Sequence, residues 1–524
     1  MIFAPKRAQL MATFAATLVL TGVWSRAAAP AASPAGTNYL FYVTNCLDTL
    51  MAYGTDRYGA RPAPILVSIL DVETRQCPSN PAALDEEWRV SRRERRNPAG
   101  ANLLTDQPTL KILYAVSQLT GQPNYARFAD NYVRWYLDHL VDEKGFIWWG
   151  WHRHYDVFHD QMLGHLGNPH EIHAIHCIAW ERLWAVNPAA VRREIEAIWR
   201  WHVVDKQTGE INRHGDGQHG CDFAMSAGAC LYAFAFLYTR THEPVWLDRA
   251  LLLARYYRER RNADTGLFPD RPNAGSARFD GSHFVTADTG LYCHALLKAY
   301  ELTGDKVFRD DALNYLKAYA RYGYDSATGQ FWGSLNLDGT PVPGPRAVPE
   351  TLKTQEAYQV YEPRGYLDLW QPYAAGYEHP LPTAQAYAYA AQLTGDSAML
   401  NTAARFASLI EKNLPPRACL TNTWYRGYAE RCAPAGTYAG SYGQAISFFL
   451  HLYVLTGEAH YRSLARQIAD EAIARLYHEG LFRGHPAKPY YEAMDGVGYL
   501  LYALLELSLE PKQLKGAALA LDNW

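Results

Sequence analysis

The chain has 524 residues, of which 48% are hydrophobic and 20% are charged, and its formal net charge is −3. This charge balance excludes the broad positive surface that nucleic-acid binding requires. The hydrophobic content is sufficient for a large core, and the length alone would allow about two to four domains.

The first 29 residues have the pattern of a secretory signal peptide. Lys6 and Arg7 form a positive start, the stretch 10–23 is mostly apolar, and small residues at 27–29 provide a cleavage site. The apolar run is shorter than the roughly 20 residues that a bilayer-spanning helix needs, and no later stretch is long and apolar enough. We therefore expect an exported protein, periplasmic or extracellular, that makes no membrane contact after signal cleavage.

The eight cysteines can form disulfides in an exported chain. Two predicted pairs each bracket a loop-like segment. Three further cysteines lie in apolar helical stretches, where we expect buried free thiols. The predicted pairs are Cys46/Cys77 and Cys419/Cys432, and the predicted free thiols are Cys177, Cys230 and Cys293.

A short phrase, Leu-Thr-Gly followed by a polar residue, recurs along the chain at a spacing of about 60 residues or a small multiple of it. Each copy ends an apolar helix with a glycine cap, and an amphipathic helix follows after a short turn, as in 290–303 followed by 307–324. A loop containing glycine and an aromatic residue comes next, as in 478–482. The copies begin at Leu119, Leu302, Leu393 and Leu455, with a degenerate copy at 238–241.

Repeated helix pairs bury their apolar faces by stacking on their neighbours, either in an open solenoid or in a closed ring. About six or seven units without polar terminal caps favour the ring. We therefore predict an all-α fold, an (α/α)6–7 toroid: an incomplete barrel of helix hairpins with long loops and at most a small accessory sheet. It is expected to occupy residues 30–524 as one domain, with functional residues in the loops at one end.

The stretch 338–382 departs from the repeat because it is rich in proline and aromatic residues. It accounts for the longer gap between the copies at Leu302 and Leu393. This composition fits either a rim insertion that contacts substrate or a segment that only packs.

Ten of the 19 histidines lie between His152 and His219, interleaved with acidic residues. Imidazole and carboxylate together suit a borderline divalent metal such as Mn²⁺, Co²⁺ or Zn²⁺, while Ca²⁺, which prefers an all-oxygen shell, is a further possibility. Three positions fall at the same phase of successive repeat units, so the toroid would bring them to one end. They are His152 in a loop, Glu171 at the start of a predicted helix over 169–184, and His214 in the loop 212–216.

Other residues of this stretch have alternative interpretations. His154 is an alternative to His152 as the first ligand. His170, His173 and His176 lie three residues apart on the predicted helix, where a histidine is more often a core or rim residue than a ligand. The chain contains no H-E-x-x-H zinc-protease motif, no G-x-S-x-G motif and no P-loop.

The chain also contains 15 Trp and 37 Tyr, whose rings can stack on sugar faces or wedge between helices. Arginines in the loop 270–283 can clamp uronate carboxylates in a bidentate manner, or can simply be solvated. Polar neighbours of the metal candidates can orient the ligands. The predicted substrate-binding set is Trp149, Trp151, Arg153, His219, Asp222, Arg271 and Arg278, with Trp148 beside the first two.

A histidine in an early loop, a glutamate about 20 residues later and an Arg-His pair about 40 residues further on resemble the site of polysaccharide lyase family 2, the α/α-toroid pectate lyases. The resemblance covers the toroid repeat and the segment from His152 to His214. It implies metal ligation by His152, Glu171 and His214, and β-elimination on an acidic polysaccharide such as polygalacturonate, with Arg213 as the catalytic base. Because a guanidinium normally stays protonated above pH 12, such a base needs a local positive field and an alkaline pH.

Two other functions fit the same fold, because a fold does not fix chemistry. One is a glycoside hydrolase that uses two carboxylates, Glu171 with Asp222 or Asp216, and no metal. The other is a glycan-binding protein without catalysis, which the aromatic content would suit. A binding protein has less need of Arg213 beside so many potential ligands.

Overall fold

The computed structural model describes residues 37–79, 100–150, 153–164, 169–172, 178–273, 281–344, 364–370, 379–417 and 436–509. They belong to one compact unit, Thr37–Trp524, while the predicted signal peptide lies in a separate unit, Met1–Gly36, outside the described residues. Within the described part, no helix has both the length and the hydrophobicity to cross a bilayer.

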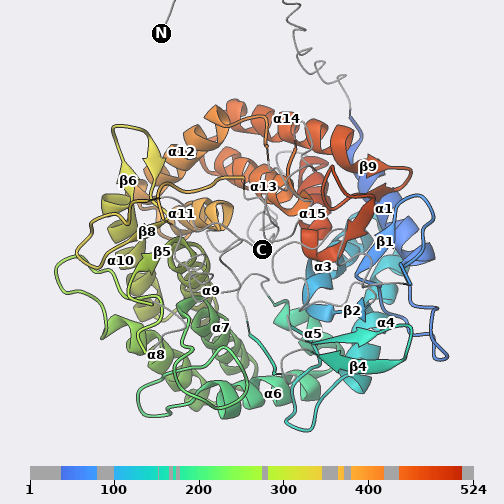
Figure 1. Ribbon diagram of the computed structural model, residues 1–524, viewed down its shortest axis with the longest axis horizontal. Helices are drawn as coiled ribbons and strands as arrows, with labels where there is room; N and C mark the ends of the chain where they lie inside the picture. Colours follow the sequence, from blue (N-terminus) through green and yellow to red (C-terminus); the bar gives the residue numbers. More distant parts are fainter. Residues whose placement is uncertain are drawn as a thin grey trace, which may run out of the picture. The chain divides into compact units, whose positions relative to one another are not determined.

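Helices of the compact unit form a ring of two layers (Figure 1). In the inner layer α7 packs on α9, α9 on α11, α11 on α13, and α13 on α15, and α15 packs on α3. These helices are buried on nearly all sides; in α11 every residue from Pro380 to Ala391 is buried. Their bounds are α3 Leu103–Thr120, α7 Ala224–Thr241, α9 Cys293–Thr303, α11 Pro380–Thr394, α13 Ala439–Thr456 and α15 Val497–Leu507.

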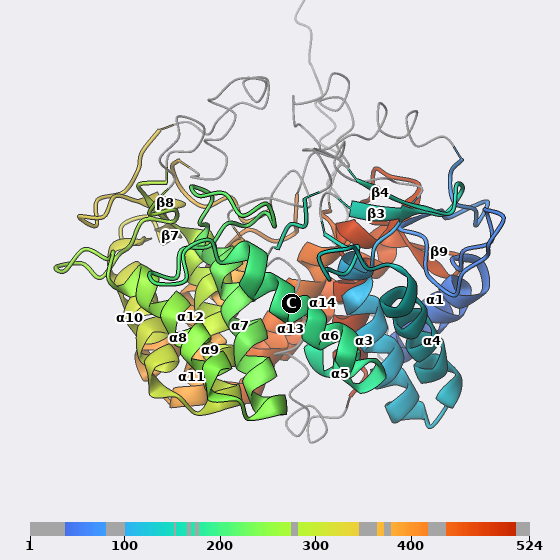
Figure 2. The same ribbon diagram turned by 90° about the horizontal axis from the view of Figure 1, so that it is seen from below.

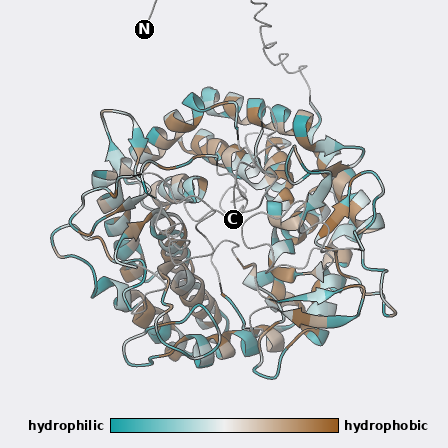
Figure 3. Ribbon diagram, in the orientation of Figure 1, coloured by the Kyte–Doolittle hydropathy of each residue, from teal (hydrophilic) through white to brown (hydrophobic). Residues whose placement is uncertain are grey.

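The outer helices α4, α8, α10, α12 and α14 each follow an inner helix and pack against it, as the hairpin repeat predicts. The outer helix α6 packs on the short helix α5 (Trp180–Val186) before it and on α7 after it. The outer helices alternate between hydrophilic and hydrophobic residues along their length (Figure 3). An additional helix, α1, packs on α15. The bounds are α1 Tyr39–Tyr53, α4 Pro123–His139, α6 Pro188–Ala197, α8 Pro244–Arg258, α10 Lys306–Tyr322, α12 Ser397–Lys412 and α14 Ala459–Leu476.

The recurring Leu-Thr-Gly phrase marks the ends of inner helices. Gly121, Gly304, Gly395 and Gly457 cap α3, α9, α11 and α13 with φ between +70° and +77°, the left-handed conformation that glycine adopts without strain. In the degenerate copy, His242 takes this place after α7 with φ +56°. The all-α toroid prediction is confirmed.

Short antiparallel strands form small sheets at one end of the ring (Figure 2). β1 pairs with β11, β9 with β10, β5 with β8 and β6 with β7, and β2, β3 and β4 form a three-stranded sheet. They are accessory, as predicted. The bounds are β1 Ile69–Asp71, β2 Gly100–Ala101, β3 Arg153–Asp156, β4 Gln161–Gly164, β5 Phe284–Val285, β6 Tyr324–Asp325, β7 Gln330–Phe331, β8 Ser334–Leu335, β9 Tyr477–His478, β10 Leu481–Phe482 and β11 Tyr490–Glu492.

The predicted helix over 169–184 is wrong. Residues 169–172 are extended, and the helix here, α5, spans only Trp180–Val186. The reason is tertiary: the peptide groups of His170 and Ile172 bond to the segment 213–215 instead of to residues four positions away. His173 and His176 lie outside the described residues.

Two further expectations are affected. Cys46 and Cys77 are buried free thiols, so the disulfide predicted between them is wrong, while Cys230 and Cys293 are free as expected. Cys177, Cys419 and Cys432 lie outside the described residues. In the described part of the stretch 338–382, Trp370 is buried and its indole donates to the Asn413 carbonyl, which is a packing role.

Candidate active site

Two short extended segments meet at the N-terminal end of α7 and bring three predicted site residues together. The Ile172 amide donates to the Arg213 carbonyl at 2.9 Å, and the Gly215 amide donates to the His170 carbonyl at 2.7 Å. Glu171 and His214 are therefore direct antiparallel partners. Partners in an antiparallel pair have side chains on the same face, so the carboxylate and the imidazole project together.

The side chains of Glu171, Arg213 and His214 converge on one carboxylate oxygen. The guanidinium of Arg213 forms an ion pair with Oε1 of Glu171. Nε2 of His214 lies 3.7 Å from the same oxygen. Glu171 and Arg213 are 1% and 2% exposed, whereas the His214 side chain is 26% exposed. The site thus has a charged floor, defined as the buried ion pair of Glu171 and Arg213, and one accessible imidazole, that of His214.

Local sequence makes this close approach possible. The Asn212 side chain accepts from the His214 amide at 2.8 Å and so shapes the turn after Arg213. Gly150 has φ +113°, and a Cβ there would lie 3.0 Å from the Glu171 carbonyl oxygen. Only glycine lets the loop before β3 lie this close to the Glu171 backbone.

A second arginine shares an aromatic ring with the first. The guanidinium carbons of Arg213 and Arg271 each lie 4.6 Å from the centroid of the Phe223 ring, within cation–π range. Arg271 is 2% exposed and its Nη1 lies 3.3 Å from Asp270. The structure therefore places Arg271 on the same ring as Arg213, and both arginines are almost completely buried.

Behind the two segments runs a buried line of polar groups. Nε2 of His170 lies 3.0 Å from Oε1 of Glu194, and Nδ1 of His170 lies 2.7 Å from Nε2 of His202. Nδ1 of His202 lies 2.7 Å from the Asn212 carbonyl oxygen. Burial raises the pKa of Glu194 to about 8 and lowers the pKa of both imidazoles. These groups are uncharged near neutral pH.

Two predicted substrate contacts are core residues instead. The Trp149 indole is 2% exposed and donates toward His170 and Glu194, each at 3.0 Å. Arg153 is 5% exposed, forms an ion pair with Asp142 at 2.9 Å and lies over the ring of Trp148. Burial argues against the sugar-binding roles predicted for Trp149 and Arg153, because their side chains are already in contact with other residues of the core.

His219 and Asp222, both predicted to bind substrate, lie in different surroundings. His219 is exposed, and its Nδ1 lies 3.0 Å from Glu210, which raises the pKa of the imidazole. Asp222 is fully buried and accepts from the Tyr256 hydroxyl at 2.7 Å and from the Asn273 amide at 2.9 Å. Burial raises the pKa of Asp222 to about 6. Its bonds orient the loop after Arg271 rather than a metal ligand.

Three predicted site residues, His152, Trp151 and Arg278, lie outside the described residues. The alternative first ligand, His154, lies on β3 opposite Leu163, and burial lowers the pKa of its imidazole to about 4. Sequence reasoning missed Phe223, His202 and Glu194 as neighbours of the site. The local sequence does not mark Phe223 or Glu194, because they come from other elements, while His202 lies within the histidine-rich stretch.

The donor set fits a divalent cation in part. A carboxylate oxygen and an imidazole nitrogen that lie 3.7 Å apart are close enough to bind one ion together. No group of three or more metal-binding side chains occurs among the described residues, and the predicted third ligand, His152, is not one of them. Glu171 and His214 are thus the two positions here that can hold the metal.

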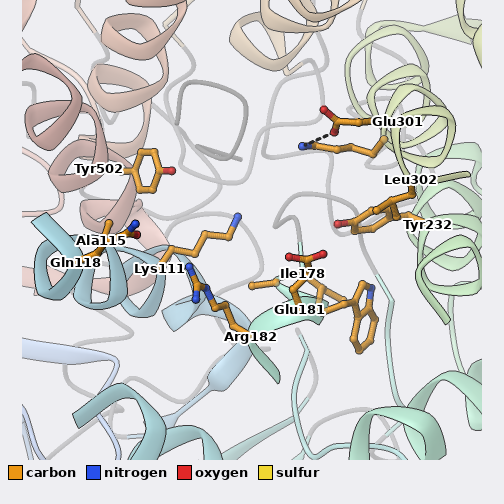
Figure 4. A pocket seen from close by; sticks show the side chains of 13 residues that line it. Lys111, Ala115, Gln118, Ile178, Glu181, Arg182, Tyr232, Glu301, Leu302 and Tyr502 are labelled. Atoms are coloured by element: carbon orange, nitrogen blue, oxygen red, sulfur yellow. Dashed lines mark hydrogen bonds and ion pairs between the residues drawn. The ribbon is translucent and has the colours of Figure 1, made fainter. Parts of the chain in front are cut away.

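A separate cavity of about 340 Å³ is lined by residues from α3, α7 and α15, among others (Figure 4). Lys111, Arg182, Tyr232 and Tyr502 turn toward it, and Glu301 forms an ion pair with Lys298 at 3.4 Å. Its lining does not include Glu171, Arg213 or His214. The segment 178–182 lines the cavity. In sequence it follows the extended segment that contains Glu171.

Comparison with known proteins identifies similar chains. The family model described as periplasmic pectate lyase matches residues 82–225. A pectate disaccharide-lyase of Dickeya dadantii (strain 3937) is 27% identical over 201 residues, which are 32% of this chain and 36% of that protein. The match thus spans about a third of the relative's length. It confirms the resemblance to polysaccharide lyase family 2 that the residues from His152 to His214 predict.

Solved structures give more distant matches. An unsaturated glucuronyl hydrolase from Bacillus sp. GL1 aligns with a TM-score of 0.45 at 12% identity, covering 90% of this chain and 96% of that one. A family 76 glycoside hydrolase from a bovine Bacteroides thetaiotaomicron strain also aligns with a TM-score of 0.45 at 12% identity, covering 90% of this chain and 77% of that one.

Proposed function

We propose, from this resemblance to polysaccharide lyase family 2, that the chain is an exported lyase that cleaves a polyuronate such as pectate by metal-assisted β-elimination. One observation carries the proposal. The Arg-His pair at 213–214 and Glu171, separate in sequence, converge on one carboxylate oxygen. The pectate lyase family model covers this segment, and its description as periplasmic supports export.

β-Elimination requires a base near C5 of the uronate and a positive charge at its carboxylate. The C5–H bond breaks, its electron pair forms the C4=C5 double bond, and the C4–O bond breaks with the leaving oxygen taking up a proton. A divalent cation held by Glu171 and His214, with His152 as a further ligand, would supply charge that makes the C5 proton more acidic. We assign the accepting base to Arg213, as in the family that the chain resembles.

The surroundings of Arg213 fix its position, and because the Glu171 carboxylate favours the charged guanidinium, the base form requires an alkaline pH. Its guanidinium is fixed by the Glu171 carboxylate on one side and the Phe223 ring on another, so its position is defined before substrate binds. His214 is the partly exposed member of the group, with 26% of its side chain accessible. Burial of the other two excludes water from the charged floor.

The hydrolase alternative has less support. Its second carboxylate would be Asp222 or Asp216. Asp222 is fully buried and bonded to Tyr256, and Asp216 accepts from Asn212 at 2.9 Å and from Gln218 at 2.9 Å within its own turn. Both carboxylates thus already accept hydrogen bonds from neighbouring groups.

The proposal is tested with a panel of polysaccharides, with and without a chelator. We expect a polyuronate to yield an unsaturated product that absorbs in the ultraviolet, and we expect a chelator to abolish that absorbance and added Mn²⁺ to restore it. Reducing ends without the absorbance would instead indicate the hydrolase. Binding to a polyuronate without any product would indicate the non-catalytic glycan-binding protein.

A further inference from the structure

The buried line behind the site links the two segments that hold Glu171 and Arg213. Its members are Glu194 of α6, His170 beside Glu171, His202 in the π-helical turn η2 (Ile198–His202), and the carbonyl of Asn212 beside Arg213. His170, His202 and Glu194 are 2%, 0% and 0% exposed. They cannot touch a polysaccharide, and yet they form a continuous set of short polar contacts.

The chemistry of the end group fixes the direction of every bond. A carbonyl oxygen only accepts, so Nδ1 of His202 carries the hydrogen and donates to Asn212. Nε2 of His202 then accepts from Nδ1–H of His170, at 2.7 Å. The Trp149 indole N–H, which can only donate, lies 3.0 Å from Nε2 of His170 and identifies that nitrogen as an acceptor.

The remaining contact assigns the state of Glu194. Its Oε1 lies 3.0 Å from a His170 nitrogen that carries no hydrogen, so the favourable form is the neutral acid, which donates its O–H to that nitrogen. Its other oxygen accepts from the Ile147 amide at 2.6 Å. Stacking of the Phe146 ring on His170, at 4.1 Å between centroids, fixes the plane of the imidazole.

This line matters because the two extended segments are short. Their direct backbone connection comprises the bonds of Ile172 and Gly215, and so small a strand pair has little stability of its own. The imidazole of His202 lies between His170 and Asn212 and thereby sets the spacing of the segments from behind. A change of that spacing would move the carboxylate of Glu171 relative to Arg213 and His214.

We propose that His202 is a positioning residue, which holds Glu171, Arg213 and His214 in register through His170 and Asn212. This inference rests on the proposed function, since the register matters for a metal and a base. His202 touches neither substrate nor metal. It acts on both through the backbone of the two segments.

The test compares two buried histidines in the full chain. His202→Phe removes both polar contacts of the line. The matched control is His451→Phe. His451 is 1% exposed and is bonded to two side chains, Gln385 and Gln392, but it lies on a different element, α13. Mn²⁺ binding is measured by calorimetry without substrate, together with thermal unfolding, kcat and KM on polygalacturonate.

We expect both phenylalanine variants to lower the unfolding temperature, but only His202→Phe to weaken Mn²⁺ binding, by about 10- to 100-fold, and to lower kcat more than it raises KM. His202→Asn keeps a donor toward the Asn212 carbonyl and should recover part of the loss. Equal Mn²⁺ affinity and kcat in His202→Phe and His451→Phe would overturn the inference.

A second pair of variants applies if His202→Phe does not fold. Glu194→Leu breaks the line at its other end and should reproduce the loss of affinity, while Glu194→Gln keeps a donor toward His170 and should retain it. Equal affinities for the two would also overturn the inference. If the wild type neither binds Mn²⁺ nor forms the unsaturated product, the proposed function is wrong and so is the inference. If the wild type does both and only the compared variants show equal affinities, only the inference is wrong.

Discussion

Glu171 and Arg213 form an ion pair that is almost completely buried. Burial of two charges costs several kcal/mol of desolvation per ion, which their attraction only partly offsets, so such a pair is weak evidence for a stabilising role. Its position beside the partly exposed His214 is consistent with a functional role instead.

Substitution of Arg213 tests this interpretation. Arg213→Lys keeps the positive charge but loses the planar guanidinium that contacts both Glu171 and Phe223. We expect kcat on polygalacturonate to fall by about 10²- to 10³-fold, measured by the ultraviolet absorbance of the product. Arg192→Lys, in an ion pair on the surface that is 41% exposed, serves as the control and should leave kcat unchanged. Full activity of Arg213→Lys would contradict the assigned role.

Asp106 gives a prediction on pH. It is fully buried on α3, accepts from the Tyr132 hydroxyl at 2.5 Å, and burial raises its pKa from 3.8 to about 7. Because the folded-state pKa is raised, the stability contribution of the neutral acid is fully present below pH 3.8 and is lost as the pH rises through 7. Asp106→Asn should therefore gain unfolding free energy relative to the wild type between pH 5 and pH 8, on the order of 2 kcal/mol.

Denaturant unfolding at several pH values measures this difference. Asp396→Asn is the control of opposite sign, since the bond from Lys317 lowers the pKa of Asp396. Its contribution to stability is present at high pH and is lost as the pH falls, and it should be small because the pair is partly exposed. The same pH dependence in wild type and Asp106→Asn would show that Asp106 does not titrate in this window.

At the scale of elements, the loop of Gly150 and the extended segment of Glu171 constrain each other. Gly150→Ala would place a Cβ 3.0 Å from the Glu171 carbonyl oxygen at φ +113°. We expect lower stability and weaker Mn²⁺ binding, because the backbone of Glu171 must move. Gly121→Ala is the matched control: its φ is +73°, but a Cβ there meets nothing within 4 Å.

Calorimetric titration with Mn²⁺ and thermal unfolding distinguish these two glycines. Gly121→Ala should cost only the conformational strain, about 1 kcal/mol, and should leave Mn²⁺ affinity unchanged. Unchanged affinity in Gly150→Ala as well would mean that the loop and the Glu171 segment are not coupled.

At the scale of the compact unit, the closed ring makes the two ends of the fold interdependent. α15 packs on both α1 and α3, and β11 pairs with β1. A chain that ends at Thr456 would lack α14, α15 and β11, and would leave the apolar faces of α1 and α3 uncovered.

We expect the chain that ends at Thr456 to lose cooperative unfolding altogether, as followed by circular dichroism during heating. A chain that begins at Thr37 lacks only the separate unit Met1–Gly36 and should unfold like the full chain. An open solenoid would behave differently, because removal of a terminal repeat leaves the other repeats folded. Helix content reduced only in proportion to the deleted residues would therefore contradict ring closure.

The sequence by itself determined the helix hairpins, because glycine caps and apolar periodicity act within a few residues: Gly121, Gly304, Gly395 and Gly457 end helices as predicted. It also identified Glu171, Arg213 and His214 as a set, through their resemblance to a known family.

Only the tertiary structure decided the roles of residues whose partners lie far away in sequence. The segment 169–172 is extended, despite its helical pattern, because it pairs with 213–215. Trp149 and Arg153 are predicted substrate contacts, but in the structure they bond to His170, Glu194 and Asp142 in the core. Burial depends on how the whole ring is assembled, so it cannot be predicted from a short stretch of sequence.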